Sequence, residues 1–229
     1  MKNNFIRILL ITCLVCPACN KMLDEDIRSQ VVGNYLNSPT GWQSGVNGVY
    51  GTLKNIFCAI EDNGIIPEIT VFGTDTYTNG FDGGFKMMNF YNSDLNPRTN
   101  VIYYNWRNLY VAINACNTVI DKAELVTGLS DDIKNTRLGE VRFIRAQYYY
   151  LLVELWGPVP LSLKETQTIE TNATRAPVKD IFAAIIDDLS FAIQHLPAVA
   201  SNYGRVTKPA AEQLLANVYL AKATSEAKE

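Results

Sequence analysis

Apolar residues recur at the spacing of an α-helix through most of this 229-residue chain, and no stretch shows the sustained alternation of a half-buried strand. The first run follows Ser38-Pro39, and its apolar residues lie four, three, one, three and four positions apart, at Trp42, Val46, Val49, Tyr50, Leu53 and Phe57. Such spacings put side chains on one helix face. Ser38 is a suitable N-cap, and proline is tolerated in the first turn. The pattern predicts a helix over about 39–57.

Four further runs predict helices bounded by capping residues, proline or glycine. They cover about 101–125, 130–156, 178–196 and 207–224. The helix that begins at Ser130 or Asp131 is expected to end at Gly157-Pro158. The helix pairs at 101–156 and 178–226 resemble a tetratricopeptide-type stack, although no strict sequence repeat is present. We therefore predict an all-α, tetratricopeptide-like helical-repeat stack with a long irregular insertion between its first two helices.

The insertion, over 61–100, contains five glycines that interrupt any period. A structureless run of this length is uncommon unless it has a function. Nine aromatic residues lie from Phe72 to Trp106, with only two basic and three acidic residues among them. Aromatic faces beside uncharged amides suit a neutral, hydroxyl-rich ligand, because a ring covers the apolar face of a sugar while Asn and Asp hydrogen-bond to its edges. The same rings can equally pin an irregular segment onto the helices.

The charge balance argues against nucleic-acid binding. The chain has a net charge of −3 and a pI near 5.3, without a basic stripe. Its one histidine, His195, falls in the last turn of a predicted helix, and the sequence presents no nucleophile or orienting partner for it. Asp187 and Asp188 are adjacent and point about 100° apart on a helix, so adjacency alone does not make them an acid–base pair. With no glycine-rich phosphate loop or metal-spaced cluster, we predict no catalytic residue, metal or cofactor.

We expect the cysteines and two of the arginines to have structural roles rather than functional ones. Only two cysteines, Cys58 and Cys116, lie outside the N-terminal segment, both within apolar helical patterns, which predicts two buried thiols rather than a disulfide or zinc site. Arg142 and Arg145 share a predicted helix with Glu140. We interpret them as forming structural ion pairs with neighbouring helices rather than ligand contacts.

The N-terminal 18 residues have the features of an export signal. A short basic region precedes an apolar run over 8–15, which is too short to cross a membrane as a helix. The following Cys16-Pro17-Ala18-Cys19 resembles the lipobox of bacterial lipoproteins. That resemblance implies a signal peptide over 1–18, acylation of Cys19 (a palmitate-type anchor) and a polar tether over 19–38. An ordinary signal peptide cleaved nearby is the alternative.

Four further segments, in order, carry a second resemblance. They are the Trp-x-x-Leu-Tyr-x-x-Ile-Asn-x-x-Asn run from Trp106, the stretch from Gly139-Glu140-Val141-Arg142 to Trp156-Gly157-Pro158-Val159-Pro160-Leu161, the stretch from Arg175-x-Pro177 to Leu196-Pro197, and Gly204-Arg205-Val206-Thr207-Lys208 with the helix after it. Together with Val46-Asn47-Gly48-Val49-Tyr50, they make the chain similar to the SusD/RagB family of outer-membrane nutrient-binding lipoproteins of Bacteroidetes. Family members are typically about twice as long, so residues 39–229 are expected to form a SusD-like N-terminal helical domain without the C-terminal half.

The resemblance implies a lipid-anchored outer-membrane protein, surface-exposed, as the acidic Asp24-Glu25-Asp26 also suggests by its similarity to export signals of such lipoproteins. It further implies that the protein binds an oligosaccharide or peptide nutrient and delivers it to a TonB-dependent, SusC-like transporter. The protein would then not be an enzyme. Two alternatives stay open: a helical-repeat scaffold that only contacts a partner protein, and a surface glycosidase.

The best candidates for ligand contact are Asp75, Tyr77, Tyr104 and Trp106. Each combines an aromatic or acceptor group with a local break or a helix start. Trp106 is also part of a family motif, so the same position can equally belong to the core.

Overall fold

The computed structural model describes residues 35–58, 66–78, 80–81, 84–168 and 171–226. The expected signal peptide over 1–18, the lipidated Cys19 and most of the tether lie outside these described residues. No helix within the described ranges is long and apolar enough to span a membrane.

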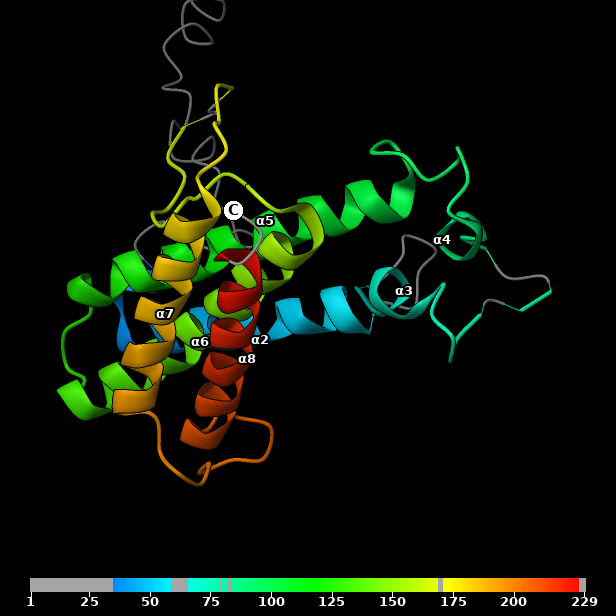
Figure 1. Cartoon of the computed structure of the whole chain (residues 1–229). Coiled ribbons are helices and arrows are strands. Elements are labelled where there is room, and N and C mark those ends of the chain that lie inside the picture. Colours follow the sequence, from blue (N-terminus) through cyan, green and yellow to red (C-terminus); the bar gives the residue numbers. More distant parts are fainter. Residues whose placement is uncertain (1–34, 59–65, 79, 82–83, 169–170, 227–229) are drawn as a thin grey trace, which may run out of the picture. The chain divides into compact units, whose positions relative to one another are not determined.

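The described residues form helices and no strand (Figure 1). The α-helices are α2 (Pro39–Phe57), α3 (Ile66–Val71), α4 (Met87–Phe90), α5 (Asn100–Lys122), α6 (Asp131–Trp156), α7 (Val178–His195) and α8 (Lys208–Glu226), and the 3-10 turns are η2 (Tyr35–Asn37) and η3 (Ala123–Leu125). The all-helical prediction is confirmed, and the five predicted helices correspond to α2, α5, α6, α7 and α8. The insertion is not wholly irregular, because it contains α3 and α4. These helices have only six and four residues, too short to show a periodic pattern.

The helix boundaries result from local chemistry. The Ser38 hydroxyl accepts a hydrogen bond from the backbone amide of Gly41 at 3.1 Å, and Ser130 caps α6 in the same way. Helix α6 ends where Gly157 adopts a φ of 67°, which glycine tolerates without a steric penalty. The predicted caps and stops at these positions are confirmed.

Helix α6 contacts four other long helices, namely α2, α5, α7 and α8. Trp42 on α2 is fully buried, and its indole nitrogen donates to the Val119 carbonyl of α5 at 2.8 Å. Helix α6 and the end of α7 approach each other closely at Gly139, where a Cβ would lie 3.3 Å from the Leu196 side chain. The core therefore lies around α6, and α5 extends from it toward α3 and α4 (Figure 1).

Both described cysteines are free, but only one has the predicted environment. Cys116 is fully buried on α5, whereas Cys58 is exposed. The prediction of two buried thiols is wrong for Cys58 because this residue comes after the last residue of α2 with non-helical backbone angles. It therefore does not continue the apolar face of the helix.

Candidate functional site

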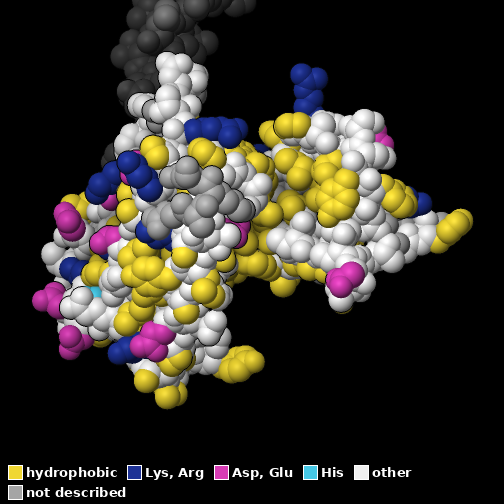
Figure 2. Space-filling model, in the orientation of Figure 1, with side chains coloured by type: hydrophobic (Ala, Val, Ile, Leu, Met, Phe, Trp, Pro, Cys, Tyr) yellow, Lys and Arg dark blue, Asp and Glu magenta, His cyan; other side chains and the backbone are white. Residues whose placement is uncertain are grey.

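A cavity of about 600 Å³ lies beside the N-terminal end of α5. We call it the aromatic pocket; its lining residues are Ile69, Met88, Tyr91, Leu95, Asn96, Pro97, Ile102, Tyr103, Trp106, Trp156 and Arg175. Figure 2 shows hydrophobic side chains gathered on this face, where Figure 1 places the start of α5 beside α4. The volume falls within the range of about 300–1,000 Å³ that is usual for small-molecule sites.

Two tryptophans from separate helices form the inner wall of the aromatic pocket. The rings of Trp106 on α5 and Trp156 on α6 meet edge to face, with centroids 5.5 Å apart. Trp106 also packs against Tyr110, one turn further along α5, at 5.1 Å. Trp156 is the last residue of α6, and Gly157 turns the chain away directly after it. Because both rings are held by neighbours, their exposed faces are fixed before any ligand arrives.

The outer wall of the aromatic pocket comes from the insertion and from the first turn of α5. Tyr91 comes directly after α4 with a left-handed φ of 47° and is exposed, and Tyr103 on α5 is about half exposed. Helix α4 is tied to the preceding loop by Asn89, whose side-chain oxygen accepts from the Gly73 amide at 2.9 Å and whose amide donates to the Thr78 hydroxyl. These contacts hold the loop after α3 next to the helix that carries Met88.

The polar groups of the aromatic pocket are few and carry no negative charge. The side chain of Asn96 is already bonded to the Asp94 carbonyl at 3.1 Å and to the Arg98 amide at 3.0 Å. Arg175 is the only charged lining residue, and it makes no ion pair with any described residue. The pocket thus offers ring faces for stacking and one guanidinium that can donate hydrogen bonds.

Only one of the four candidate residues lines the aromatic pocket. Trp106 does so, and Tyr104 is half-buried with its ring 5.3 Å from that of the lining Tyr103. Asp75 and Tyr77 are exposed in the loop after α3 and do not line the pocket.

Sequence reasoning missed several lining residues, above all Tyr91, Tyr103, Trp156 and Arg175. The two tyrosines belong to the aromatic-rich stretch, but nothing in the sequence distinguishes them from the other rings there. Trp156 and Arg175 lie far along the chain, and no local pattern indicates that they meet α5. The WGPVP segment and the Arg-x-Pro motif that contain them indicate a family resemblance in the sequence, not a shared cavity.

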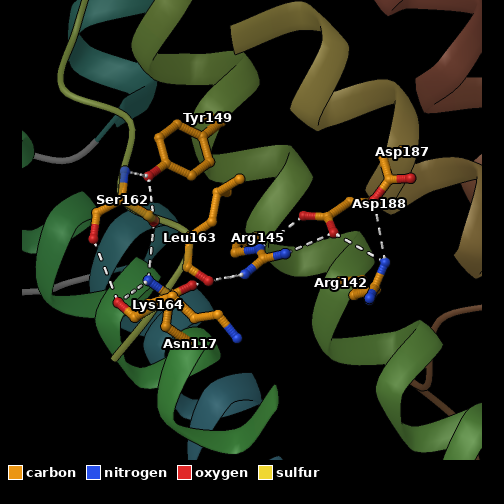
Figure 3. Close-up of polar contacts among 9 residues, drawn as sticks. All are labelled: Asn117, Arg142, Arg145, Tyr149, Ser162, Leu163, Lys164, Asp187 and Asp188. Atoms are coloured by element: carbon orange, nitrogen blue, oxygen red, sulfur yellow. Dashed lines mark hydrogen bonds and ion pairs between the residues drawn. The ribbon is translucent and has the colours of Figure 1, made fainter. Parts of the chain in front are cut away.

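A buried polar network fixes the chain after α6 (Figure 3). We call residues 158–166 the strap. Arg145 of α6 donates to the Leu163 carbonyl at 3.2 Å and to the side chain of Asn117 at 2.8 Å. The Asn117 amide in turn donates to the carbonyls of Ser162 and Lys164, each at 3.0 Å.

The predicted structural ion pairs are confirmed. Arg145 makes a bidentate pair with Asp188 of α7 at 2.7 and 2.8 Å, and Arg142 approaches Asp187 at 3.4 Å (Figure 3). Glu140 is buried and pairs with two arginines, on its own helix and before α8. These groups link helices to one another, as expected from burial with charge compensation.

The adjacent aspartates of α7 have different surroundings. Asp188 is buried while the Asp187 side chain is 80% exposed, so the two do not face one another across a cleft.

The ring of His195 packs on that of Phe191, with centroids 4.3 Å apart. Burial raises the pKa of Tyr149 to about 12, so this phenol stays neutral and donates to the Ser162 carbonyl at 2.7 Å.

Comparison with known proteins gives one consistent result. Residues 50–220 match the family model SusD-like_3, described as "Starch-binding associating with outer membrane". A SusD-like protein of Bacteroides ovatus is 35% identical over 122 residues, which cover 51% of this chain and 22% of the relative. SusD-like protein P25 of Formosa agariphila is 26% identical over an alignment of 239 positions, which covers 96% of this chain and 43% of that protein.

A solved structure agrees with these sequence matches. The structure of a "Laminarin binding SusD-like protein" superposes with a TM-score of 0.71 at 25% identity, covering 82% of this chain and 41% of the other. In each of these comparisons the matched region spans less than half of the relative.

Proposed function

The chain belongs to the SusD-like family, and from this premise we propose that it binds an oligosaccharide at the aromatic pocket. The family is one of glycan-binding proteins without catalytic activity, and its description includes association with the outer membrane. The related protein described as laminarin-binding is consistent with a glycan as ligand.

The observation that carries this proposal is the set of four rings, Tyr91, Tyr103, Trp106 and Trp156, around one cavity without a negative charge. Sugar rings have apolar faces that stack on aromatic side chains, and each such contact contributes on the order of 1 kcal/mol. The Arg175 guanidinium can donate to sugar hydroxyls. Four such contacts and one or two hydrogen bonds from Arg175 add up to about 4–8 kcal/mol, which corresponds to an affinity in the micromolar to millimolar range.

We keep Asp75, Tyr77 and Tyr104 in the proposal as residues around the rim of the aromatic pocket. Tyr77 precedes Thr78, which is bonded to Asn89 beside the lining Met88. That tie supports a role for the loop in contacting the part of a glycan that leaves the pocket.

The test is calorimetry against a glycan panel, with wild type and two matched tyrosine variants. Tyr103 lines the aromatic pocket and Tyr219 on α8 does not, yet their side chains are 52% and 51% exposed. Tyr103→Ala should weaken binding roughly threefold to tenfold, while Tyr219→Ala should leave it unchanged. Equal affinity in all three proteins would remove the aromatic pocket from the binding site.

Ionic strength tests the chemistry of the ligand in the same assay. Stacking and neutral hydrogen bonds are insensitive to salt, whereas contacts between exposed charges are screened. We expect the affinity to hold when salt is raised. A collapse of binding would instead indicate an acidic ligand held by Arg175 and would overturn the neutral-sugar interpretation.

For the cellular setting we propose a surface lipoprotein that hands its glycan to a TonB-dependent, SusC-like transporter. The basis is the lipobox-like Cys16-Pro17-Ala18-Cys19 and the outer-membrane association in the family description. Two acyl chains hold a protein stably because each buried methylene contributes about 0.8 kcal/mol. Cys19→Ala should release the protein from membranes, whereas Cys58→Ala should not; continued membrane fractionation of the first variant would refute the anchor.

We also propose that α5–α8 form a tetratricopeptide-like stack of two helix pairs. Consecutive helices contact one another throughout this part of the chain, and α6 also contacts α8. This arrangement supports a repeat stack in which each pair covers the apolar face of the next.

A further inference from the structure

A second cavity, of about 510 Å³, shares Trp106 with the aromatic pocket. It lies between α5 and the segment that follows Gly157-Pro158, and we call it the hydroxyl pocket. We propose that it is a second subsite for the same glycan, so that the protein recognises an extended oligosaccharide chain rather than a single terminal sugar. This inference rests on the proposed function and adds a binding site to it.

The lining of the hydroxyl pocket combines aromatic and aliphatic residues with four hydroxyl side chains and carries no charge. It includes the side chains of Ser162, Thr166, Thr168 and Thr174, and no acidic or basic residue contributes. The three threonines are exposed, and within the described part of the chain their hydroxyls make no hydrogen bond. Each hydroxyl can both donate and accept, which matches the hydroxyl groups of a sugar. The chemistry thus complements the ring faces of the aromatic pocket.

The part of the wall that carries Ser162 and Thr166 is held in place without ligand. Tyr110 donates to the Pro160 carbonyl at 2.8 Å, and the backbone amide of Thr166 donates to the side-chain oxygen of Asn114 at 2.8 Å. Ser162 exchanges two hydrogen bonds with the Tyr149 hydroxyl, at 2.7 and 2.8 Å. A wall that is already ordered loses little conformational entropy on binding.

Trp106 connects the two cavities. The residue lines both, so the cavities adjoin at one ring. A chain of linked sugars that stacks on this ring extends into the aromatic pocket on one side and into the hydroxyl pocket on the other. Contacts in the second cavity become available only to ligands long enough to reach it, and binding should therefore strengthen with chain length.

The experiment uses calorimetry with laminari-oligosaccharides and malto-oligosaccharides, each from the disaccharide to the hexasaccharide. For wild type we expect affinity to rise about tenfold along a ladder that binds. Thr166→Val combined with Thr174→Val removes two hydroxyls and keeps the side-chain shape. That variant should lose roughly threefold to tenfold for the hexasaccharide and nothing for the disaccharide.

The matched control is Thr127→Val, which alters an exposed threonine outside both cavities. It should bind every oligosaccharide as wild type does. Binding that is independent of chain length, or a double variant that keeps full affinity for the hexasaccharide, overturns the second subsite and leaves the aromatic pocket standing. Absence of binding by wild type to either ladder overturns the proposed function and this inference together.

Discussion

Replacing Asp188 with alanine should destabilise the protein much more than the same change at its neighbour Asp187. Asp188 is 2% exposed and accepts two hydrogen bonds from Arg145, at 2.7 and 2.8 Å. The Asp187 side chain is 80% exposed and lies 3.4 Å from Arg142. The two substitutions are chemically identical and adjacent on α7, so any difference between them reports the surroundings of the carboxylate.

The size of the effect depends on the charge that is left behind. Without Asp188, the Arg145 guanidinium stays buried with its charge uncompensated, which typically costs about 3–5 kcal/mol. Arg145 keeps its bonds to Asn117 and to the Leu163 carbonyl. We therefore expect the low end, about 3 kcal/mol, against less than about 1 kcal/mol for the exposed pair of Asp187. In a domain of this size the first value lowers the melting temperature by about 6–12 °C.

The assay is urea and thermal unfolding monitored by circular dichroism. A second variant, Arg145→Met with Asp188→Leu, removes both charges and should be less destabilised than the sum of the single changes. Equal stability losses for Asp187→Ala and Asp188→Ala would refute the reasoning, because the buried pair would then be no stronger than a surface one.

Three shorter predictions concern other parts of the fold. Gly41→Ala should lower the unfolding free energy by about 1–3 kcal/mol, because the added Cβ would lie 1.9 Å from a backbone oxygen of η2. Gly48 lies in open space on the same helix, so Gly48→Ala should raise the unfolding free energy by about 0.5–1 kcal/mol. Urea midpoints that move in the same direction for both variants would contradict this prediction. Burial opposes the ionisation of Asp121, but hydrogen bonds from the Glu165 amide and the Lys164 ammonium group of the strap outweigh it and lower the pKa of this carboxyl. Its stabilisation is therefore complete above the ordinary pKa near 4 and is lost as the pH falls further, and Asp121→Asn should reduce this acid sensitivity in melts across that range. Cys58 should react with a thiol reagent in the native protein while Cys116, buried and with its pKa raised by burial, reacts only after unfolding; equal rates would contradict the burial.

Helix positions were predictable from the sequence because their causes are local. The apolar spacing from Trp42 to Phe57 and the caps at Ser38 and Ser130 act within one or two turns of the chain. The same holds for the stop at Gly157, where the backbone needs a positive φ. Short helices such as α3 and α4 escaped prediction because fewer than two turns carry no period.

The sequence was sufficient to predict that the arginines of α6 form structural ion pairs, but not to predict which acidic residue each one contacts. Burial of Arg145 on a predicted helix face required compensation, and two acidic residues stood next to one another on a later helix. That Asp188 rather than Asp187 lies inside depends on how α7 rotates against α6, which is set by the packing of both helices.

The composition of the aromatic pocket was decided by tertiary structure. The sequence by itself indicated an aromatic-rich stretch from Phe72 to Trp106 and selected Trp106 at its end. Trp156 and Arg175 join the same cavity because α6 packs on α5 and the backbone amide of Ala176 donates to the Val159 carbonyl, which brings the chain back beside the end of α6. Cys58 shows where a sequence pattern stops being informative. This residue lies one position beyond the end of α2, where the helical period no longer fixes the direction of a side chain. Local hydrogen bonding and periodicity determine where helices begin and end, whereas a binding surface depends on contacts between segments far apart in the chain, which only the packing of the helices brings together.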